Sequence, residues 1–283
     1  MVAGAGVGTA AAFVESEHPR LVRVEIALPR LPQKLDGFTI AQLSDFHYDE
    51  YFSRTPIATA VKMVNALNPD MVALTGDFVT VPLATAEVER APKAARDAVP
   101  CAQLLGGLRA RCGSFAVLGN HDESSDPDEV TAALQQSDIR VLRNQALPVE
   151  REGERFWLAG INDALWGEAD LKKTLRDVPA EAATVLLCHE PDFADEAANY
   201  PVDLQLSGHS HGGQVRLPLI GPPFLPPMAR KYPWGLRRVG RMMLYTNCGV
   251  GTIRIPVRWN CPPEVTLIIL RSGTRTQGGP NNG

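Results

Sequence analysis

The sequence predicts an α/β fold in which a largely parallel β-sheet is covered by helices. Eight short apolar runs have the length and the β-branched content of buried strands. Segments with apolar residues at helical spacing lie between them, and five of the runs end in a cluster of polar side chains. Ligand sites in such sheets form beyond the carboxyl ends of the strands. The predicted fold therefore also predicts where a functional site should lie.

The expected strands follow one another along the chain without an internal repeat. Five of them end in a polar cluster: FTIAQLSDFH (38–47), MVALTGDF (71–78), GSFAVLGNHD (113–122), ATVLLCHEP (183–191) and VDLQLSGHSH (202–211). Three more read as strands of the same kind: FWLAGIND (156–163), RMMLYTNCG (241–249) and EVTLIIL (264–270).

Three helical regions are expected between these strands. Residues 55–67 have apolar side chains at helical spacing and stop at Asn68-Pro69. The Ala-rich segment 84–108 reads as one or two helices. Residues 127–136 begin like a helix, with Asp126 as the expected N-cap and a proline in the first turn.

The termini differ from the rest of the chain in composition. We expect residues 1–30 to be an N-terminal tail, residues 31–272 to be the folded domain and residues 273–283 to be a disordered tail. The apolar start fits either a flexible tail or the remnant of an export or membrane segment. Cytoplasmic, membrane-associated and exported locations therefore all stay open.

Composition excludes some classes of partner. The formal net charge is -4, so a global attraction to long nucleic acid is not expected. The five cysteines form no CxxC pair, which argues against a thiolate zinc site, and we expect them to be mostly buried free thiols.

The histidines sort into the strand-end clusters. Five of the six, namely His47, His121, His189, His209 and His211, lie there, and only His18 lies outside. Scattered structural histidines would not be expected to sort in this way.

Each cluster alone is a weak or moderate signal. Asp45 and His47 alternate, so on an extended strand both would point to one face. A single such pair is common, many strands end in a Gly-Asp turn like that at Asp77, and a lone His189 would usually be structural. The glycine-flanked pair His209 and His211 is a better chelate, because the glycines allow close backbone approach.

Together the clusters resemble the calcineurin-like metallophosphoesterase superfamily over residues 38–270. The matching motifs, all in the family order, are Asp45-Phe46-His47, Gly76-Asp77, Gly119-Asn120-His121-Asp122, His189 and Gly208-His209-Ser210-His211. The runs LDGFTIAQLSDFH, SGHSHGGQVRLP and TNCGVGTIRIPVR resemble the YkuE-like bacterial branch, which is related to UDP-2,3-diacylglucosamine hydrolases. The resemblance implies a four-layer αββα sandwich with mixed, largely parallel sheets and a dinuclear metal site at the strand carboxyl ends.

The resemblance also implies a role for each matching residue. One metal would be held by Asp45, His47, Asp77 and His211, and the second by Asp77, Asn120, His189 and His209. Asp77 would then bridge two ions about 3.5–4 Å apart. Such carboxylate, imidazole and amide ligands suit two divalent ions of Mn, Fe, Zn or Co, and the sequence leaves the native metal open.

Two further residues are expected to be catalytic. His121 would stabilise the transition state and protonate the leaving oxygen. Asp122 would accept a hydrogen bond from the imidazole of His121, although a carboxylate at this position can also serve as a helix N-cap or turn residue.

The resulting function is hydrolysis of a phosphodiester or pyrophosphate bond by a metal-bridging hydroxide, with lipid-linked and nucleotide-sugar substrates as candidates. A phosphomonoesterase acting on nucleotides or proteins would use the same metals and stays an alternative. A catalytically silent binding scaffold is an alternative of another class, although such scaffolds lose ligands and this sequence keeps them. A nuclease is disfavoured by the acidic net charge.

The segment between Asp203 and Glu264 is a local exception in charge. It contains no acidic residue and eight basic ones. Within it, residues 217–241 combine prolines, apolar residues and cations, and we expect a loop beside His209 and His211. Either the loop packs on the domain with solvated arginines, or its Phe224, Leu225 and Trp234 make peripheral contact with an anionic lipid surface or a lipid-linked substrate.

Overall fold

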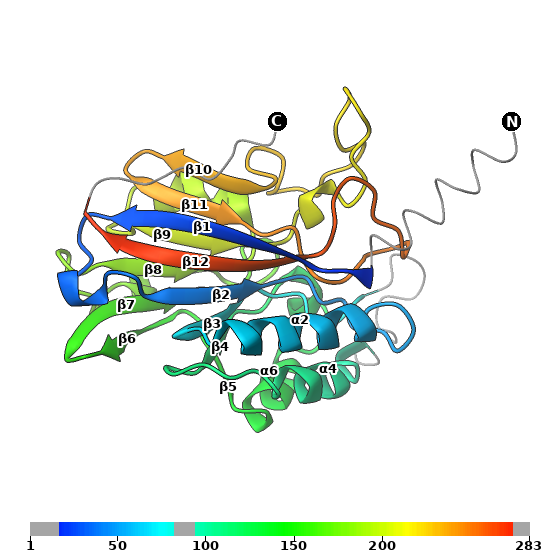
Figure 1. Cartoon of the computed structure of the whole chain (residues 1–283), viewed down its shortest axis with the longest axis horizontal. Coiled ribbons are helices and arrows are strands. Elements are labelled where there is room, and N and C mark those ends of the chain that lie inside the picture. Colours follow the sequence, from blue (N-terminus) through cyan, green and yellow to red (C-terminus); the bar gives the residue numbers. More distant parts are fainter. Residues whose placement is uncertain (1–16, 82–93, 274–283) are drawn as a thin grey trace, which may run out of the picture.

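The computed structural model describes residues 17–81 and 94–273, which form two β-sheets packed face to face (Figure 1). The first sheet has the strand order β1-β12-β2-β3-β4-β5, and all neighbours in it are parallel except β12 and β2. Its strands are β1 (Arg20–Leu28), β2 (Thr39–Leu43), β3 (Met71–Leu74), β4 (Ser114–Ala116), β5 (Ile139–Val141) and β12 (Glu264–Ser272).

The second sheet has the order β10-β11-β9-β8-β7-β6. Its outermost pairs, β10 with β11 and β6 with β7, are antiparallel, and its central strands are parallel. The strands are β6 (Gln145–Arg151), β7 (Glu154–Gly160), β8 (Thr184–Leu187), β9 (Leu204–Ser207), β10 (Gly235–Val239) and β11 (Met242–Thr246).

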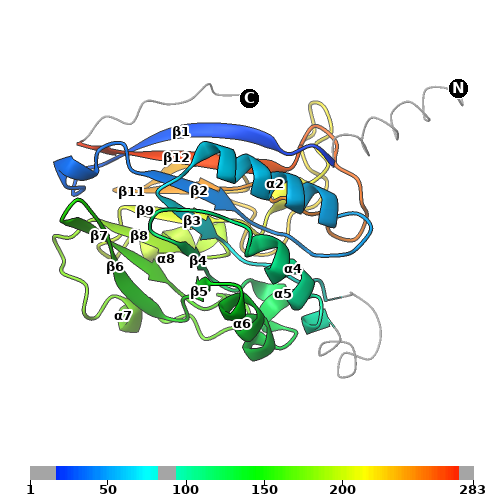
Figure 2. The same cartoon turned by 60° about the horizontal axis from the view of Figure 1, so that its bottom comes forward.

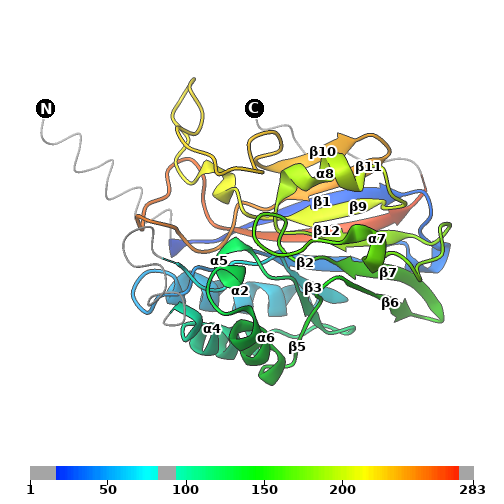
Figure 3. The same cartoon turned by 180° about the vertical axis from the view of Figure 1, so that it is seen from behind.

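Helices cover the outer face of each sheet, as Figures 2 and 3 show. On the first sheet lie α2 (Arg54–Leu67), α4 (Ala98–Leu105) and α6 (Pro127–Gln136), with α5 (Asn120–Glu123) beside them. On the second lie α7 (Leu171–Thr174) and α8 (Ala194–Ala197). Three short 3-10 helices complete the set: η1 (Gln33–Leu35), η2 (Pro191–Phe193) and η3 (His211–Gly213). The layers confirm the expected αββα sandwich with largely parallel sheets.

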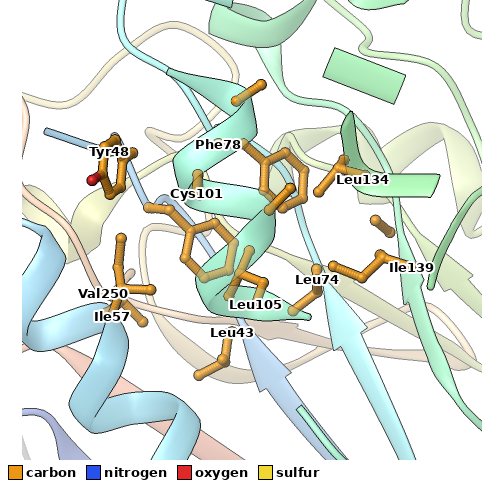
Figure 4. Close-up of a cluster of buried hydrophobic side chains, with 14 of the residues drawn as sticks. Leu43, Tyr48, Ile57, Leu74, Phe78, Cys101, Leu105, Leu134, Ile139 and Val250 are labelled. Atoms are coloured by element: carbon orange, nitrogen blue, oxygen red, sulfur yellow. The ribbon is translucent and has the colours of Figure 1, made fainter. Parts of the chain in front are cut away.

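Two apolar cores hold the site-bearing part of the sandwich. Between the sheets, Phe38 meets Phe156 edge to face with ring centroids 5.1 Å apart. Under α2 and α4, the residues that follow β2 and β3 enter the second core, where Phe46 and Phe78 stack at 5.1 Å (Figure 4 shows this cluster around Phe78). The segments that carry the polar clusters are thus anchored by buried apolar neighbours.

The predicted boundaries of two helices are confirmed. The helix α2 ends at Asn68, which adopts a left-handed conformation with φ of 48° before Pro69. The helix α6 begins after Asp126, whose Oδ1 accepts a hydrogen bond from the backbone N–H of Glu129 at 3.0 Å. The third predicted region retains α4 near its end, while residues 82–93 lie outside the described part of the chain.

The structure corrects the expected N-terminal tail. Residues 20–28 form β1, which pairs in parallel with β12 over its whole length. The run RLVRVEIAL has the aliphatic composition of a strand, but its partner lies at the other end of the chain, so only the tertiary fold provides the pairing. The strands β5, β6 and β10 were also not predicted, and β10 lies inside the segment expected to be a loop.

The remaining expectations about the termini concern residues 1–16 and 274–283, which lie outside the described residues. Within residues 17–81 and 94–273, no helix has the length and apolar composition needed to cross a membrane.

Candidate metal centre

The predicted ligands come together at one edge of the sandwich because the strands that precede them end there. Asp45 follows β2, Asp77 follows β3, and Asn120 follows β4 and opens α5. His189 follows β8, while His209 and His211 follow β9. Apart from the half-buried Asn120, all of them are buried.

The backbone of the ligand loops is unusual. Asp45, His47, Asp77, His209 and His211 all have positive φ, between 41° and 68°. This region costs free energy for side chains other than glycine, and it persists where the surrounding structure enforces it. The expectation that Asp45 and His47 share one face of an extended strand is therefore wrong, since both lie beyond β2 in left-handed turns that bring them to the same site.

Glycines make room for these turns. A Cβ on Gly119 would lie 2.7 Å from the backbone nitrogen of Asp77 and 2.8 Å from Cε1 of His189. A Cβ on Gly76, which has φ of 95°, would lie 2.6 Å from the backbone nitrogen of Gly119. The loops approach one another so closely that only glycine fits at these two positions.

The first group of candidate ligands contains Asp45, His47 and His211, whose donor atoms all lie within 4.8 Å of one another. Nε2 of His211 is 3.4 Å from Oδ1 of Asp45 and 3.0 Å from Nε2 of His47. Two imidazole nitrogens at this distance need a proton or a cation between them. Both carboxylate oxygens of Asp45 also accept the backbone N–H of His209, at 2.9 and 3.0 Å.

The second group contains Asp77, His189 and His209. Oδ2 of Asp77 lies 3.2 Å from Nε2 of His189 and 3.4 Å from Nε2 of His47. This oxygen therefore sits between the two groups. Although burial opposes ionisation of Asp77, the positive charge of His189 holds the pKa of the carboxyl well below its usual range.

Unpartnered polar atoms test whether the site fits metal ions. Oδ1 of Asn120 and Nδ1 of His211 are buried and make no hydrogen bond within the described part of the chain, and Nε2 of His189 has only its 3.2 Å contact with Oδ2 of Asp77. Buried polar atoms are nearly always paired, so two unpartnered atoms in one cluster need an explanation. Carboxylate, imidazole and amide donors converging there fit divalent transition ions.

Outer contacts orient several of the imidazoles. Nδ1 of His189 donates to the carbonyl of Thr75 at 2.6 Å, which turns Nε2 toward Asp77. Nε2 of His209 donates to the carbonyl of Pro227 at 2.8 Å, so Nδ1 faces the cluster. Burial lowers the pKa of His209 to about 4, which keeps this imidazole neutral and able to bind a cation.

His121 lies at the opening of the cluster, with its ring edge to face against His47 at 4.8 Å. Its Nδ1 is 2.9 Å from the backbone nitrogen of Val81. A backbone N–H can only donate, so Nδ1 accepts and the neutral ring carries its proton on Nε2. Burial lowers the pKa of His121 to about 4.

Asp122 takes the second of its two expected roles, that of a turn residue at the start of a helix. Its carboxylate accepts backbone N–H groups of Asp77, Phe78, Val79 and Gly119, at 2.8 to 3.2 Å. The predicted hydrogen bond from the imidazole of His121 is wrong, because Asp122 points into the buried turn after β3. It ties that turn to the loop after β4.

Sequence reasoning missed a residue that links the metal-binding turn to the neighbouring wall. The side-chain amide of Gln214 accepts from Ile253 N–H at 2.8 Å and donates to the carbonyls of Ile253 and Ile255, both at 3.1 Å. Its place directly after the GHSHGG motif was the available signal.

A pocket of about 660 Å³ opens beside the cluster. His47 and His121 belong both to the cluster and to the lining of the pocket. The remaining lining comes from three segments and a single residue, namely residues 48, 49 and 52, residues 80 and 81, residues 252–256, and Asp97. Tyr48, Phe52 and Ile255 make part of this lining apolar.

The segment 217–241 forms a projecting loop followed by β10 (Figure 1). Leu219, Ile220 and Phe224 are 108%, 76% and 52% exposed. By contrast, Leu225 and Trp234, which were expected at the tip, are partly buried, and Trp234 stacks against Arg216 at 4.1 Å. The basic residues are also not uniform, since Arg258 is fully buried and Lys231 pairs with Asp195 at 2.7 Å.

Comparisons with known proteins agree with this geometry. A family model described as calcineurin-like phosphoesterase matches residues 38–213. The chain is 34% identical to the uncharacterized metallophosphoesterase YkuE of Bacillus subtilis over 96% of this chain and 92% of that protein. It is 31% identical to phosphodiesterase YaeI of Escherichia coli, over 82% of each. It is 25% identical to the UDP-2,3-diacylglucosamine pyrophosphatase LpxG of Chlamydia muridarum, over 88% of each.

Proposed function

The chain belongs to the calcineurin-like phosphoesterase family, and from this premise we propose that it uses two divalent metal ions to hydrolyse a phosphodiester or pyrophosphate bond. The position of Asp77 carries the proposal. One of its oxygens lies 3.4 Å from a histidine of the first group and 3.2 Å from a histidine of the second. A single carboxylate between two sets of donors is what a pair of closely spaced ions requires.

Each ion would have its own set of ligands. Asp45, His47, Asp77 and His211 would hold the first. Asp77, Asn120, His189 and His209 would hold the second, with the unpartnered Oδ1 of Asn120 as one donor. When bound, two such ions would neutralise charge on the phosphate oxygens. They would also lower the pKa of water, so that hydroxide is available to attack phosphorus near neutral pH.

The protein's own groups prepare this site. The outer hydrogen bonds of His189 and His209 fix the direction in which each ring presents its free nitrogen. Asp122 holds the backbone around Asp77 in the left-handed turn that the carboxylate needs. These contacts set the ligand geometry before any substrate arrives.

His121 would act on the phosphate from the pocket side. Because Val81 donates to Nδ1, the neutral ring presents Nε2–H as a hydrogen-bond donor. A doubly protonated ring would place a second N–H against that of Val81. We therefore assign His121 to stabilising charge on a phosphate oxygen by a neutral hydrogen bond, in place of proton donation to the leaving group.

Two observations favour a diester or pyrophosphate over a monoester. Relatives of this chain bear the names phosphodiesterase and pyrophosphatase. The pocket beside His121 also offers an apolar wall to the group on the far side of the phosphorus. A lipid-linked or nucleotide-sugar substrate would use such a wall.

We also propose that the tip of the projecting loop touches a lipid surface. Leu219, Ile220 and Phe224 are exposed together on a loop with no acidic residue, and exposed apolar patches of this kind mark interaction sites. The expected contact thus moves from Leu225 and Trp234 to Leu219 and Ile220.

Metal analysis with a pair of chromogenic substrates tests the central proposal. Purified protein should bind up to two transition-metal ions per chain, lose activity with EDTA and recover it with Mn²⁺. Bis-p-nitrophenyl phosphate should be a better substrate than p-nitrophenyl phosphate. Metal-independent turnover would contradict the two-metal proposal, and a preference for the monoester would favour the phosphomonoesterase alternative.

A further inference from the structure

Arg254 lies at the mouth of the pocket. Among the described residues that line the pocket, it is the one with a permanent positive charge. It is exposed, while His47 and Asp77 at the metal cluster are 1% and 2% exposed. Its guanidinium therefore lies at the outer end of the pocket and the candidate metal ions at the inner end.

Within the described part of the chain, Arg254 makes no hydrogen bond or ion pair. Its guanidinium carbon lies 4.6 Å above the ring centroid of Phe224, in the projecting loop. A cation held over an aromatic ring, with its hydrogen-bond donors free, is available for an anion.

The backbone holds Arg254 in place. Its φ is 67°, in the left-handed region. The residues on both sides, Ile253 and Ile255, are held by three hydrogen bonds to the side chain of Gln214. Gln214 follows the metal-binding turn, so one amide connects the metal cluster to the wall that carries the arginine.

We propose that Arg254 is a specificity residue that binds a second phosphoryl group of the substrate while the scissile phosphorus lies at the metal cluster. Gln214 is its positioning residue. The inference rests on the proposed phosphoesterase function and deepens it by assigning the substrate two phosphoryl groups and an apolar part that packs near Ile255 and Phe52. A second phosphoryl group would supply the anionic partner that the exposed guanidinium does not have within the described part of the chain.

The test compares bis-p-nitrophenyl phosphate with bis-p-nitrophenyl pyrophosphate, which differ by one phosphoryl unit. Hydrolysis is followed by chromatography of substrate and products with Mn²⁺-loaded protein. Arg254→Met should raise KM for the pyrophosphate by about 10- to 100-fold, with little change in kcat, and should leave both constants for the diester nearly unchanged. A non-hydrolysable methylene analogue of the pyrophosphate should lose inhibitory strength in the same proportion.

Three variants make the result specific. Arg254→Lys should restore part of the affinity, because it keeps the charge but not the fork of donors. Gln214→Met should raise KM in the same direction, and adding it to Arg254→Met should cause little further loss, since both act through one contact. Arg140→Met, which removes an exposed charge from β5, should behave like the wild type.

Two results would overturn the inference. Equal losses of kcat on both substrates would place Arg254 at the scissile phosphate, and unchanged constants in a folded Arg254→Met variant would exclude it from binding. If the wild type hydrolyses neither substrate, the proposed function itself is contradicted. Failure of the inference about Arg254 and failure of the proposed function are therefore distinguishable.

Discussion

The metal cluster at the inner end of the pocket, here called the floor, and the outer end at Arg254, called the mouth, are built in opposite ways. At the floor, the ligand side chains are mostly buried, their backbone is strained, and hydrogen bonds to the carbonyls of Thr75 and Pro227 and to the carboxylate of Asp122 fix the loops. At the mouth, Arg254 and Phe224 are exposed and contact chiefly each other. Metal coordination tolerates little displacement, whereas a substrate-binding rim can vary without disturbing it. This difference suggests that the floor carries the reaction and the mouth selects the substrate.

The largest expected effect comes from breaking the floor at Asp77. Asp77→Ala removes the carboxylate between both ligand groups, so bound metal should fall and activity should drop by several orders of magnitude. Metal content is measured by elemental analysis, and turnover on bis-p-nitrophenyl phosphate. Asp177→Ala, at an 86% exposed aspartate, is the matched control and should leave both unchanged. Near-normal metal content and turnover in Asp77→Ala would rule out a bridging role.

The second effect separates chemistry from metal binding within the floor. His121→Ala should keep its metal and lose about 10²- to 10³-fold in kcat, the usual cost of removing one hydrogen-bond donor to developing charge. If the neutral Nε2–H acts on a phosphate oxygen, the loss should be similar for good and poor leaving groups. A series of aryl phosphodiesters measures this dependence. A loss that shrinks steadily with better leaving groups would restore the proton-donor role and show that Nδ1 does not stay unprotonated.

The third effect concerns the stability of the floor. Asp122→Ala leaves four backbone N–H groups without their acceptor in a buried turn, which should lower the free energy of unfolding by about 3 kcal/mol or more. Denaturant titration of the metal-free protein measures the change. Asp126→Ala, which removes a helix N-cap, should cost only about 1 kcal/mol and provides the scale. Equal costs for the two variants would mean that the turn finds other partners.

The smallest effect is expected at the tip of the projecting loop, outside the pocket. Replacing Leu219, Ile220 and Phe224 by Ser should leave hydrolysis of a small diester close to wild type and reduce sedimentation with anionic liposomes. Because cations near the lipid surface contribute about 1 kcal/mol each, binding of the parent should weaken as salt is added. Trp166→Ser, at a 70% exposed residue outside the loop, is the control. Absence of liposome binding by the parent would leave only a solvated loop.

The strand pattern by itself determined a largely parallel α/β fold, and the family resemblance of its motifs added the two-sheet sandwich and the set of site residues. Buried parallel strands give continuous apolar runs, and the carboxyl ends of the strands of one sheet share one edge, so the clusters at Asp45, Asp77 and Asn120 had to meet on one sheet and those at His189 and His209 on the other. The start of one helix after Asp126 and the end of another before Asn68 could also be predicted from the sequence, because capping depends on a few neighbouring residues.

Only the tertiary structure decided how that edge is held. The left-handed turns at Asp45 and His47, the use of Asp122 as a backbone acceptor and the pairing of β1 with β12 depend on partners far away in the chain. The same is true of the hydrogen bond that the backbone N–H of Ile253 donates to Gln214, which holds the wall beside Arg254. Local patterns fix which residues precede a turn, but the direction of each side chain depends on packing against segments that approach it only in the folded protein.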